Sequence, residues 1–217
     1  MKLTCAVVVS LFVMANLLDA KPVAIPNETA TLDIPDAWTV TPTPVTASAA
    51  PAVILSATSP DTNSAVEVIV MDNADGITTD SASFMEGEQK GLTRTVTAAG
   101  GTVQMGTTST LTLGGVPASC LTYTQTAAGG KPVSSNTYNV AANGKMYMIV
   151  AQSVGGVTDE ALKTIVNTLT FSSPPVVPAP REDKQAEKIG QLVGYVIGVL
   201  AVIVVIRWIV RRRKAQA

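Results

Sequence analysis

The spacing of apolar residues predicts a chain built mainly from β-strands. Between residues 30 and 152, apolar positions alternate with polar ones or form short β-branched runs, as strands do. Turn-forming pairs that contain Gly, Pro, Asn or Asp separate these runs. Asn143 and Gly144 are the clearest of these pairs, because both tolerate positive φ, and they predict a hairpin. The pattern predicts strands over 30–34, 38–41, 52–57, 65–71, 102–105, 109–113, 119–125, 134–141 and 145–152.

Two further segments repeat their apolar residues at helical intervals. In the first, Asp80 is a candidate N-cap and the Gly100–Gly101 pair is a stop signal. Its apolar positions are Phe84, Leu92 and Val96. In the second, Thr158 is the candidate cap, and the apolar positions are Leu162, Ile165, Val166 and Leu169. Strands and two helices together predict an α+β fold, in which an antiparallel sheet is sandwiched with the two helices.

The C-terminal run 189–210 differs from both patterns, because it is apolar on every side of a helix. As a helix it would be about 33 Å long, close to the thickness of a bilayer core. Gln191 and Arg207 interrupt it within one turn of its ends, and Trp208 suits the headgroup region. The run therefore predicts a transmembrane helix. A buried soluble helix and a processing signal are the alternatives.

The N-terminal residues 1–20 have the layout of a secretory signal peptide. Lys2 precedes an apolar stretch, and small Ala20 stands before Lys21. Cleavage after Ala20 is the first choice, cleavage after Ala15 the second, and an uncleaved anchor is a further alternative. Cys120 is the only cysteine left after cleavage, so the mature chain is expected to form no internal disulfide.

The two ends divide the chain into an exported part and a short tail. Residues 21–173 are expected to form one extracytoplasmic domain, and 174–188 a proline-rich, charged linker that holds it off the membrane. The tail 211–217 is expected in the cytoplasm, because basic residues favour that side. This arrangement predicts a single-pass protein of the bacterial cytoplasmic membrane. Its topology determinants are Arg207, Arg211, Arg212, Arg213 and Lys214.

Charge and composition exclude several functions for the exported part. Residues 21–180 contain twelve acidic and six basic residues, a balance that does not suit a nucleic-acid binder. The chain has no histidine, so Ser-His-Asp and Cys-His sites and His-ligated metals are excluded. It also has no Ser-x-x-Lys spacing, no Walker loop and no dinucleotide fingerprint. The expectation is a protein without catalytic activity, cofactor or metal.

The remaining candidate sites have plainer interpretations. Asp72, Asp75 and Asp80 could gather a weak cation, but a polar turn followed by a helix cap explains them as well. Cys120 lies in an apolar strand and is expected to be a buried small residue.

Other polar and aromatic residues are also expected to be structural. Glu86 and Glu88 lie two apart on a helix, so they are expected to be solvated and not an acid–base pair. The larger aromatic residues are expected to cover the core, although they could line a ligand groove. These residues are Trp38, Tyr123, Tyr138 and Tyr147.

Several segments together resemble the PsbP-like superfamily, which includes bacterial DcrB-type lipoproteins and domains of unknown function. They are "ATLDIPDAW", "VEVIVMD", "AAGGTVQMG", "LTLGGVPASCLTY", "YNVAANGKMYMIVAQ" and "TLTF", and they span residues 29–171. The resemblance implies a non-catalytic binding or assembly module. Members attach to photosynthetic complexes, to a small GTPase or to bacterial envelopes, and they share no set of functional residues. Typical bacterial members are lipoproteins or soluble, whereas Cys5 lies too near the start to be a lipobox cysteine.

The sequence therefore predicts a membrane-anchored extracytoplasmic binding or assembly module. Its partners are expected to be the lipid bilayer and an unidentified envelope protein, and not nucleic acid. One alternative is a sorted surface protein whose C-terminal helix is processed. The other is a carboxylate-dependent envelope hydrolase.

Glycines in the apolar run suggest one interaction surface. Gly190, Gly194 and Gly198 recur every four residues and so share one side of the helix. Small residues at this spacing let two transmembrane helices approach closely, which predicts a homo-oligomer formed through this helix. The alternative is that glycine is simply common in membrane spans.

Overall fold

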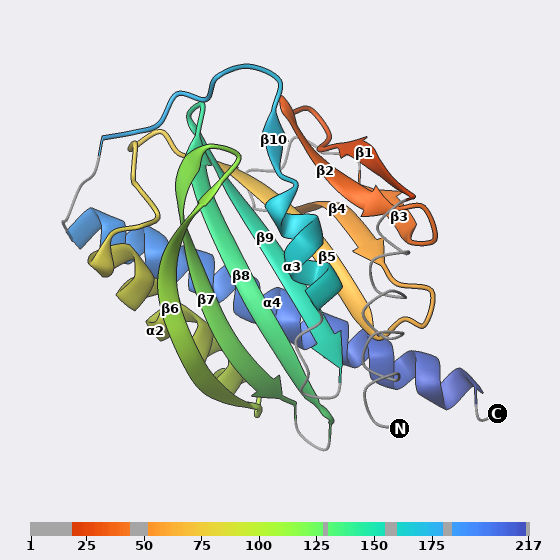
Figure 1. Ribbon diagram of the computed structural model, residues 1–217. Coiled ribbons are helices and arrows are strands. Elements are labelled where there is room, and N and C mark those ends of the chain that lie inside the picture. The colour runs from red at the N-terminus through yellow and green to blue at the C-terminus, as the bar shows by residue number, and fades with distance from the viewer. Residues whose placement is uncertain (1–18, 44–51, 128–129, 155–159, 180–183, 216–217) are drawn as a thin grey trace, which may run out of the picture.

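The computed structural model describes residues 19–43, 52–127, 130–154, 160–179 and 184–215, with 200–215 described by their backbone alone. Its centre is an antiparallel sheet of seven strands in the order β3-β4-β5-β9-β8-β7-β6 (Figure 1). The strands in that order are β3 (Thr39–Pro42), β4 (Ala52–Thr58), β5 (Ser64–Asp72), β9 (Lys145–Val154), β8 (Pro132–Ala142), β7 (Val116–Thr126) and β6 (Thr102–Leu113).

A second sheet of three strands, in the order β1-β2-β10, lies beside the first. Its central strand β2 (Ala30–Pro35) agrees with the predicted strand 30–34. The outer strands β1 (Ala20–Ala24) and β10 (Thr170–Phe171) were not predicted. Since β1 contains a proline and β10 has only two residues, neither carries an alternating pattern.

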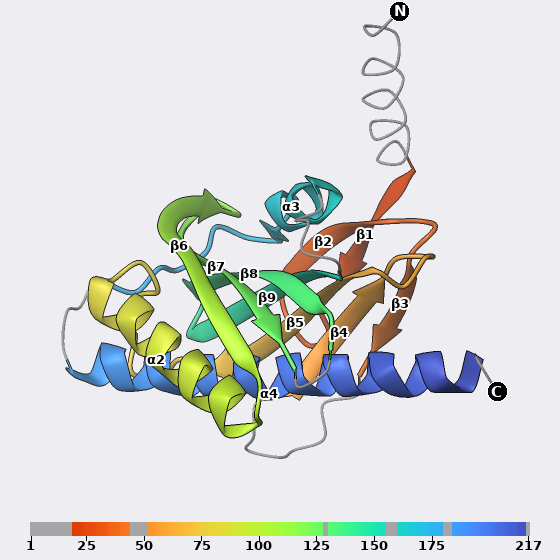
Figure 2. The same ribbon diagram turned by 90° about the horizontal axis from the view of Figure 1, so that it is seen from below.

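Helices cover both faces of the large sheet (Figure 2). The short helix α3 (Glu160–Asn167) and the small sheet lie on one face. The helices α2 (Ala82–Ala98) and α4 (Lys184–Ala215) lie on the other. The predicted α+β sandwich of antiparallel strands and helices is therefore confirmed, with α4 as an additional element of the α2 layer.

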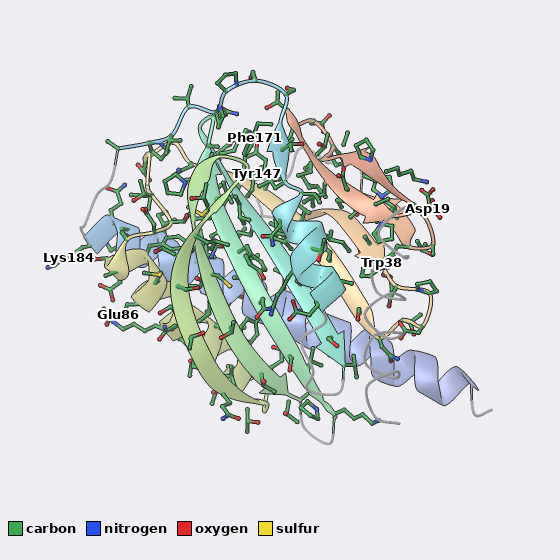
Figure 3. All side chains as sticks on the ribbon, in the orientation of Figure 1. Asp19, Trp38, Glu86, Tyr147, Phe171 and Lys184 are labelled. Atoms are coloured by element: carbon green, nitrogen blue, oxygen red, sulfur yellow. The ribbon has the colours of Figure 1, made fainter. Side chains whose placement is uncertain are left out.

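The face toward α3 and the small sheet holds the larger apolar core. Leu32, Val68, Ile149 and Ile165 are fully buried there. The aromatic residues were predicted to cover the core, and Trp38, Tyr138 and Tyr147 do so from this side. The Tyr147 ring meets Phe171 edge to face, with ring centroids 5.5 Å apart (Figure 3). This contact ties β10 to the large sheet.

The predicted strands of the large sheet are all present. The segments 102–105 and 109–113 belong to one strand, β6, whose pairing with β7 shifts register between Met105 and Thr108. The hairpin at Asn143 and Gly144 is confirmed, since φ is 55° at Asn143 and 71° at Gly144. Alternation and turn chemistry thus located these strands correctly.

Helix α2 agrees with the first predicted helix except at its cap. The Ser81 hydroxyl accepts a hydrogen bond of 3.1 Å from the Phe84 backbone N–H, so Ser81 and not Asp80 is the N-cap. Helix α3 begins at Glu160, and its expected cap Thr158 lies outside the described residues. Both predicted helices are present.

The segment before α4 lies on the body of the domain. Val176 accepts a backbone hydrogen bond of 2.8 Å from Asn143 and donates one of 2.8 Å to the Asn143 side chain. Residues 172–179 have no regular secondary structure. Helix α4 begins at Lys184, within the segment predicted as a linker. These contacts place Val176 against the domain, and the expectation that the segment 174–188 holds the domain off the membrane stays a prediction.

Among the described residues, no helix has a stretch long and apolar enough to cross a membrane. The structure therefore does not show the predicted transmembrane helix over 189–210. Of the predicted signal peptide 1–20, only Asp19 and Ala20 are described. The side chains of the predicted topology determinants, from Arg207 to Lys214, lie outside the described part.

Candidate functional site: the sheet face beneath α2 and α4

The face of the central strands that lies under α2 and α4 carries a group of buried polar residues among apolar ones. Successive residues of a strand point to opposite faces. In β8, Tyr138 and Val140 belong to the core beneath α3, so Ser135, Thr137 and Asn139 face α2 and α4. The same alternation places further polar residues on the α2 and α4 side, namely Glu67 in β5, Gln152 in β9, and Ser119, Tyr123 and Gln125 in β7.

These polar residues are neighbours across the strands. Ser135 pairs with Gln152 on one side and with Tyr123 on the other, while Asn139 pairs with Ser119. Leu121, Met148 and Val150 lie on the same face between them. We refer to the eight polar residues together as the polar face, and they are Glu67, Ser119, Tyr123, Gln125, Ser135, Thr137, Asn139 and Gln152.

The polar face is covered in this structure. Thr137 and Asn139 are 0% exposed, and Gln152 is 2% exposed. Several polar atoms have no hydrogen-bond partner among the described residues: Gln125 Nε2, Ser135 Oγ, Thr137 Oγ1, Asn139 Oδ1 and both polar atoms of the Gln152 carboxamide. Burying such an atom without a partner costs about 1–3 kcal/mol. The polar face is therefore poorly matched to an apolar cover.

Tyr123 has the same kind of environment. Its hydroxyl makes no hydrogen bond of good geometry, although the Thr137 and Ser135 side chains lie beside it. Burial raises the pKa of the Tyr123 hydroxyl, which therefore stays protonated and keeps a donor.

Helix α2 adds a buried carboxyl group to the polar face. Glu88 is 0% exposed, and its Oε1 accepts a hydrogen bond of 3.0 Å from the Asn139 carboxamide. The same Asn139 nitrogen lies 3.3 Å from Ser119 Oγ. Desolvation raises the pKa of Glu88 to about 8, and the Asn139 hydrogen bond opposes this only in part. Glu88 therefore carries a proton at neutral pH.

The prediction that Glu88 is solvated is wrong, whereas Glu86 is exposed as expected. Glu88 lies four residues after Phe84 and four before Leu92, and both of these are buried. Its place on the apolar side of the helix was a signal in the sequence. A helical residue follows the face that its neighbours at i−4 and i+4 define, whatever its own polarity.

A line of glycines joins α2 to α4. A Cβ built on Gly87 would overlap the carbonyl oxygen of Glu187, and one built on Gly190 would overlap that of Phe84. The two backbones therefore touch. Gly91 of α2 and Gly194 and Gly198 of α4 lie along the same contact. The glycines predicted to pair two transmembrane helices thus face α2 of their own chain here, and their self-association stays a prediction.

Charged groups close one end of this contact. Lys90 Nζ lies 2.8 Å from Glu187 Oε1 and 2.8 Å from Glu86 Oε1. Its two carboxylate partners raise the pKa of Lys90, and Lys90 lowers that of Glu187. All three groups are at least partly exposed to solvent, which screens their charges, so each pair adds little to stability. Ala186, Val193 and Ile197 supply the buried apolar part of the contact.

The other candidate sites hold no comparable arrangement. Asp72 forms an ion pair of 2.7 Å with Lys145, and Asp80 lines a small pocket with Pro117 and Pro178. Within the described ranges, no three His, Cys, Asp or Glu side chains are placed to hold a metal ion. Cys120 is buried as predicted, and desolvation raises its thiol pKa to about 11.

Several solved structures are similar to this one to different degrees. The solution structure of cyanobacterial PsbP (CyanoP) from Synechocystis matches with a TM-score of 0.57 and 11% identity, over 70% of this chain and 92% of that one. LpqN, involved in cell envelope biogenesis of Mycobacterium tuberculosis, matches with a TM-score of 0.44 and 20% identity, over 71% and 91%. A Bacteroides thetaiotaomicron protein matches with a TM-score of 0.46 and 10% identity, over 70% and 48%.

No family model and no curated protein matches the chain. The likeness to CyanoP agrees with the resemblance seen in the sequence motifs, and at this identity it concerns the fold alone. The chain therefore has a PsbP-like fold.

Proposed function

We propose that this protein is a single-pass, membrane-anchored binding module on the extracytoplasmic side of a bacterial membrane, without catalytic activity. The polar face beneath α2 and α4 is its binding face. The run 189–210 within α4 is its anchor, and the basic residues that follow keep the tail in the cytoplasm.

One observation carries this proposal: eight buried polar side chains lie among apolar ones on the sheet face that α2 and the largely apolar helix α4 cover. Buried polar side chains are normally hydrogen-bonded, so several unpartnered ones on a single face favour a partner that is bound there in another state. When α4 spans the bilayer, it no longer covers this face. The unpartnered atoms of Ser135, Thr137 and Gln152 then become free to bind.

The chemistry of the polar face indicates the kind of partner. It presents carboxamides, hydroxyls and the protonated Glu88 carboxyl, and none of the buried polar residues that the structure describes is Lys or Arg. A phosphate or another anion would find no cation there. Strands β5, β9, β8 and β7 are all paired on both sides, so a partner cannot add a strand to them. The face suits a neutral partner that carries hydroxyl or amide groups.

Thiol labelling in intact spheroplasts tests the topology. Lys131 is exposed on the domain, and Ala217 is the last residue of the printed sequence. A membrane-impermeant maleimide should label Lys131→Cys in intact spheroplasts and Ala217→Cys only after lysis. The native Cys120 gives little background because it is buried. Equal labelling of both variants before lysis, or release of the protein by alkaline carbonate, would contradict the proposal that the run 189–210 anchors the protein in the membrane.

Site-specific photocrosslinking tests the binding face. A benzoylphenylalanine at Gln152 should give an adduct in intact cells, since this residue lies on the polar face. The matched control is Gln104, which is exposed on β6. An adduct from position 152 that is lost in the Asn139→Leu background, with none from position 104, supports the proposal. The same adducts from both positions would mean that the polar face is not selective.

A further inference from the structure

We propose that α4 is an exchangeable cover, which either docks on α2 and closes the polar face or inserts into the bilayer and opens it. This inference rests on the proposed function and adds its regulation. The membrane and the domain then compete for one helix. The polar face binds its partner only in molecules whose α4 is inserted.

The first argument is the fit between α2 and α4. Glycine inside a helix costs about 1 kcal/mol relative to alanine, so Gly87 and Gly91 weaken α2 as an isolated helix. Both lie against the α4 backbone, and a Cβ at either position would overlap it. Gly190 and Gly194 are fitted to α2 in the same way. Glycines on both partners indicate a specific docking position for α4.

The second argument is that the two positions exclude each other. Val193 and Ile197 are fully buried in the core on this side of the sheet. Both also lie within the apolar run 189–210, in the first half of the expected span. One helix cannot bury them in the domain and in the hydrocarbon at once. Inserting α4 therefore requires that it leave α2.

The third argument is that opposing contributions act on the docked position. Burial of apolar residues of α4 and of the sheet in one cluster favours it, namely Ala186, Val193, Ile197, Leu121, Met148 and Val150. The buried atoms without partners on Ser135, Thr137 and Gln152 oppose it. The Lys90–Glu187 ion pair is exposed and adds little. Opposing contributions of this kind suit a contact that has to be reversible.

Cysteine crosslinking of the full-length chain tests this inference. In the Lys90→Cys/Glu187→Cys variant, the two thiols replace ion-paired groups of α2 and α4. The matched control pair is Asp72→Cys/Lys145→Cys, which joins β5 to β9 within the domain. The protein is synthesised cell-free, with or without lipid nanodiscs, and is treated with a short bis-maleimide. Nanodisc association is measured on the same samples.

The expected result is efficient α2–α4 crosslinking without lipid and a fall of about tenfold with nanodiscs, while the control pair stays constant. If α2 and α4 crosslink efficiently both with and without nanodiscs, and the protein associates with the nanodiscs, the proposed exchange of α4 is wrong but the proposed anchor is not. The absence of α2–α4 crosslinking from both samples likewise overturns the exchange. Crosslinking in both samples without nanodisc association overturns the exchange and the proposed anchor together.

A second variant separates docking from folding. Gly91→Leu should lower α2–α4 crosslinking in the lipid-free sample and leave both nanodisc association and control crosslinking unchanged. Thr93→Leu places the same side chain on the exposed side of α2 and should change none of the three. Equal crosslinking in Gly91→Leu and Thr93→Leu would show that the glycine contact does not hold α4.

Discussion

The carboxamide of Asn139 donates a hydrogen bond of 3.0 Å to the carboxyl group of Glu88, joining strand β8 to helix α2 beneath α4. The second carboxyl oxygen of Glu88 has no partner among the described residues. A buried carboxyl group in this setting is more stable when protonated, because no described side chain places a positive charge beside it. The pair thus links the stability of the covered state to pH.

The pH dependence of stability should carry the signature of Glu88. The pKa of Glu88 is raised from 4.5, the value expected in the unfolded chain, to about 8 in the folded protein. Its contribution to the stability of the folded protein is therefore fully present below the pKa of the unfolded chain. Between about pH 4.5 and pH 8 the unfolded chain releases this proton and the folded protein keeps it, so stability falls as pH rises. Each pKa unit corresponds to about 1.4 kcal/mol.

Thermal unfolding of the lipid-free protein at several pH values measures this effect. Glu88→Gln should flatten the decline across that interval, because the amide keeps the shape and has no proton to lose. Glu86→Gln is the control, since Glu86 is exposed and should leave the decline in place. If stability falls with pH as steeply in Glu88→Gln as in the parent protein, Glu88 is not the group that causes the fall.

Replacing Gly194 should disrupt two different contacts. A Cβ at this position would overlap the Glu88 carbonyl oxygen, so Gly194→Ile should release α4 from α2 and speed hydrogen exchange in α4 of the lipid-free protein. In a membrane reporter assay, the same change should abolish self-association of the helix. Leu192→Ile, on the more exposed side of α4, should do neither. If the α4 amides exchange equally fast in Gly194→Ile and Leu192→Ile, the close approach of the two helix backbones is not needed for docking.

The Lys90 ion pairs should contribute little. Lys90→Ala removes its contacts with both Glu86 and Glu187, and because solvent screens these ion pairs the loss of stability should be small. Unfolding is measured in low and in high salt, and high salt should narrow the difference in stability between the variant and the parent protein. A large loss of stability that salt does not change would mean that the Lys90 ion pairs are a main support of docking.

The contact between Tyr147 and Glu28 should stabilise the other side of the sheet. The Tyr147 hydroxyl donates a hydrogen bond of 2.9 Å to Glu28 Oε2. Tyr147→Phe should therefore cost about 1 kcal/mol in the free energy of unfolding. The edge-to-face contact with Phe171 should remain, because the ring is unchanged. Urea denaturation measures the free energy of unfolding. An unchanged value in Tyr147→Phe would show that the hydrogen bond to Glu28 does not contribute to stability.

Much of the fold could be predicted from local patterns. In β8, apolar Tyr138 and Val140 alternate with polar Thr137 and Asn139, and this period located the strand. The hairpin after it follows from Asn143 and its neighbour, since few other residues accept positive φ. The burial of Cys120 likewise follows from its apolar strand.

The candidate site could be predicted only in part, because it depends on contacts between distant segments. Gly194 was predicted to lie in a close contact between two helices, but nothing near it in sequence indicates that the backbone of Glu88 in α2 would lie against it. The burial of Glu88 could have been inferred from its helical spacing, whereas its partner Asn139 lies 51 residues away. Local periodicity shows which side of an element is buried and not which element covers it.

The most direct test of the account is the accessibility of the polar face in the membrane-bound protein. Ser135→Cys places a thiol of nearly the same size on that face, where the parent residue is 3% exposed. In full-length protein in nanodiscs, a membrane-impermeant maleimide should label this thiol at a rate within about tenfold of exposed Lys131→Cys. Protection of Ser135→Cys as complete as that of the buried Cys120 would show that α4 stays docked, and would contradict the account.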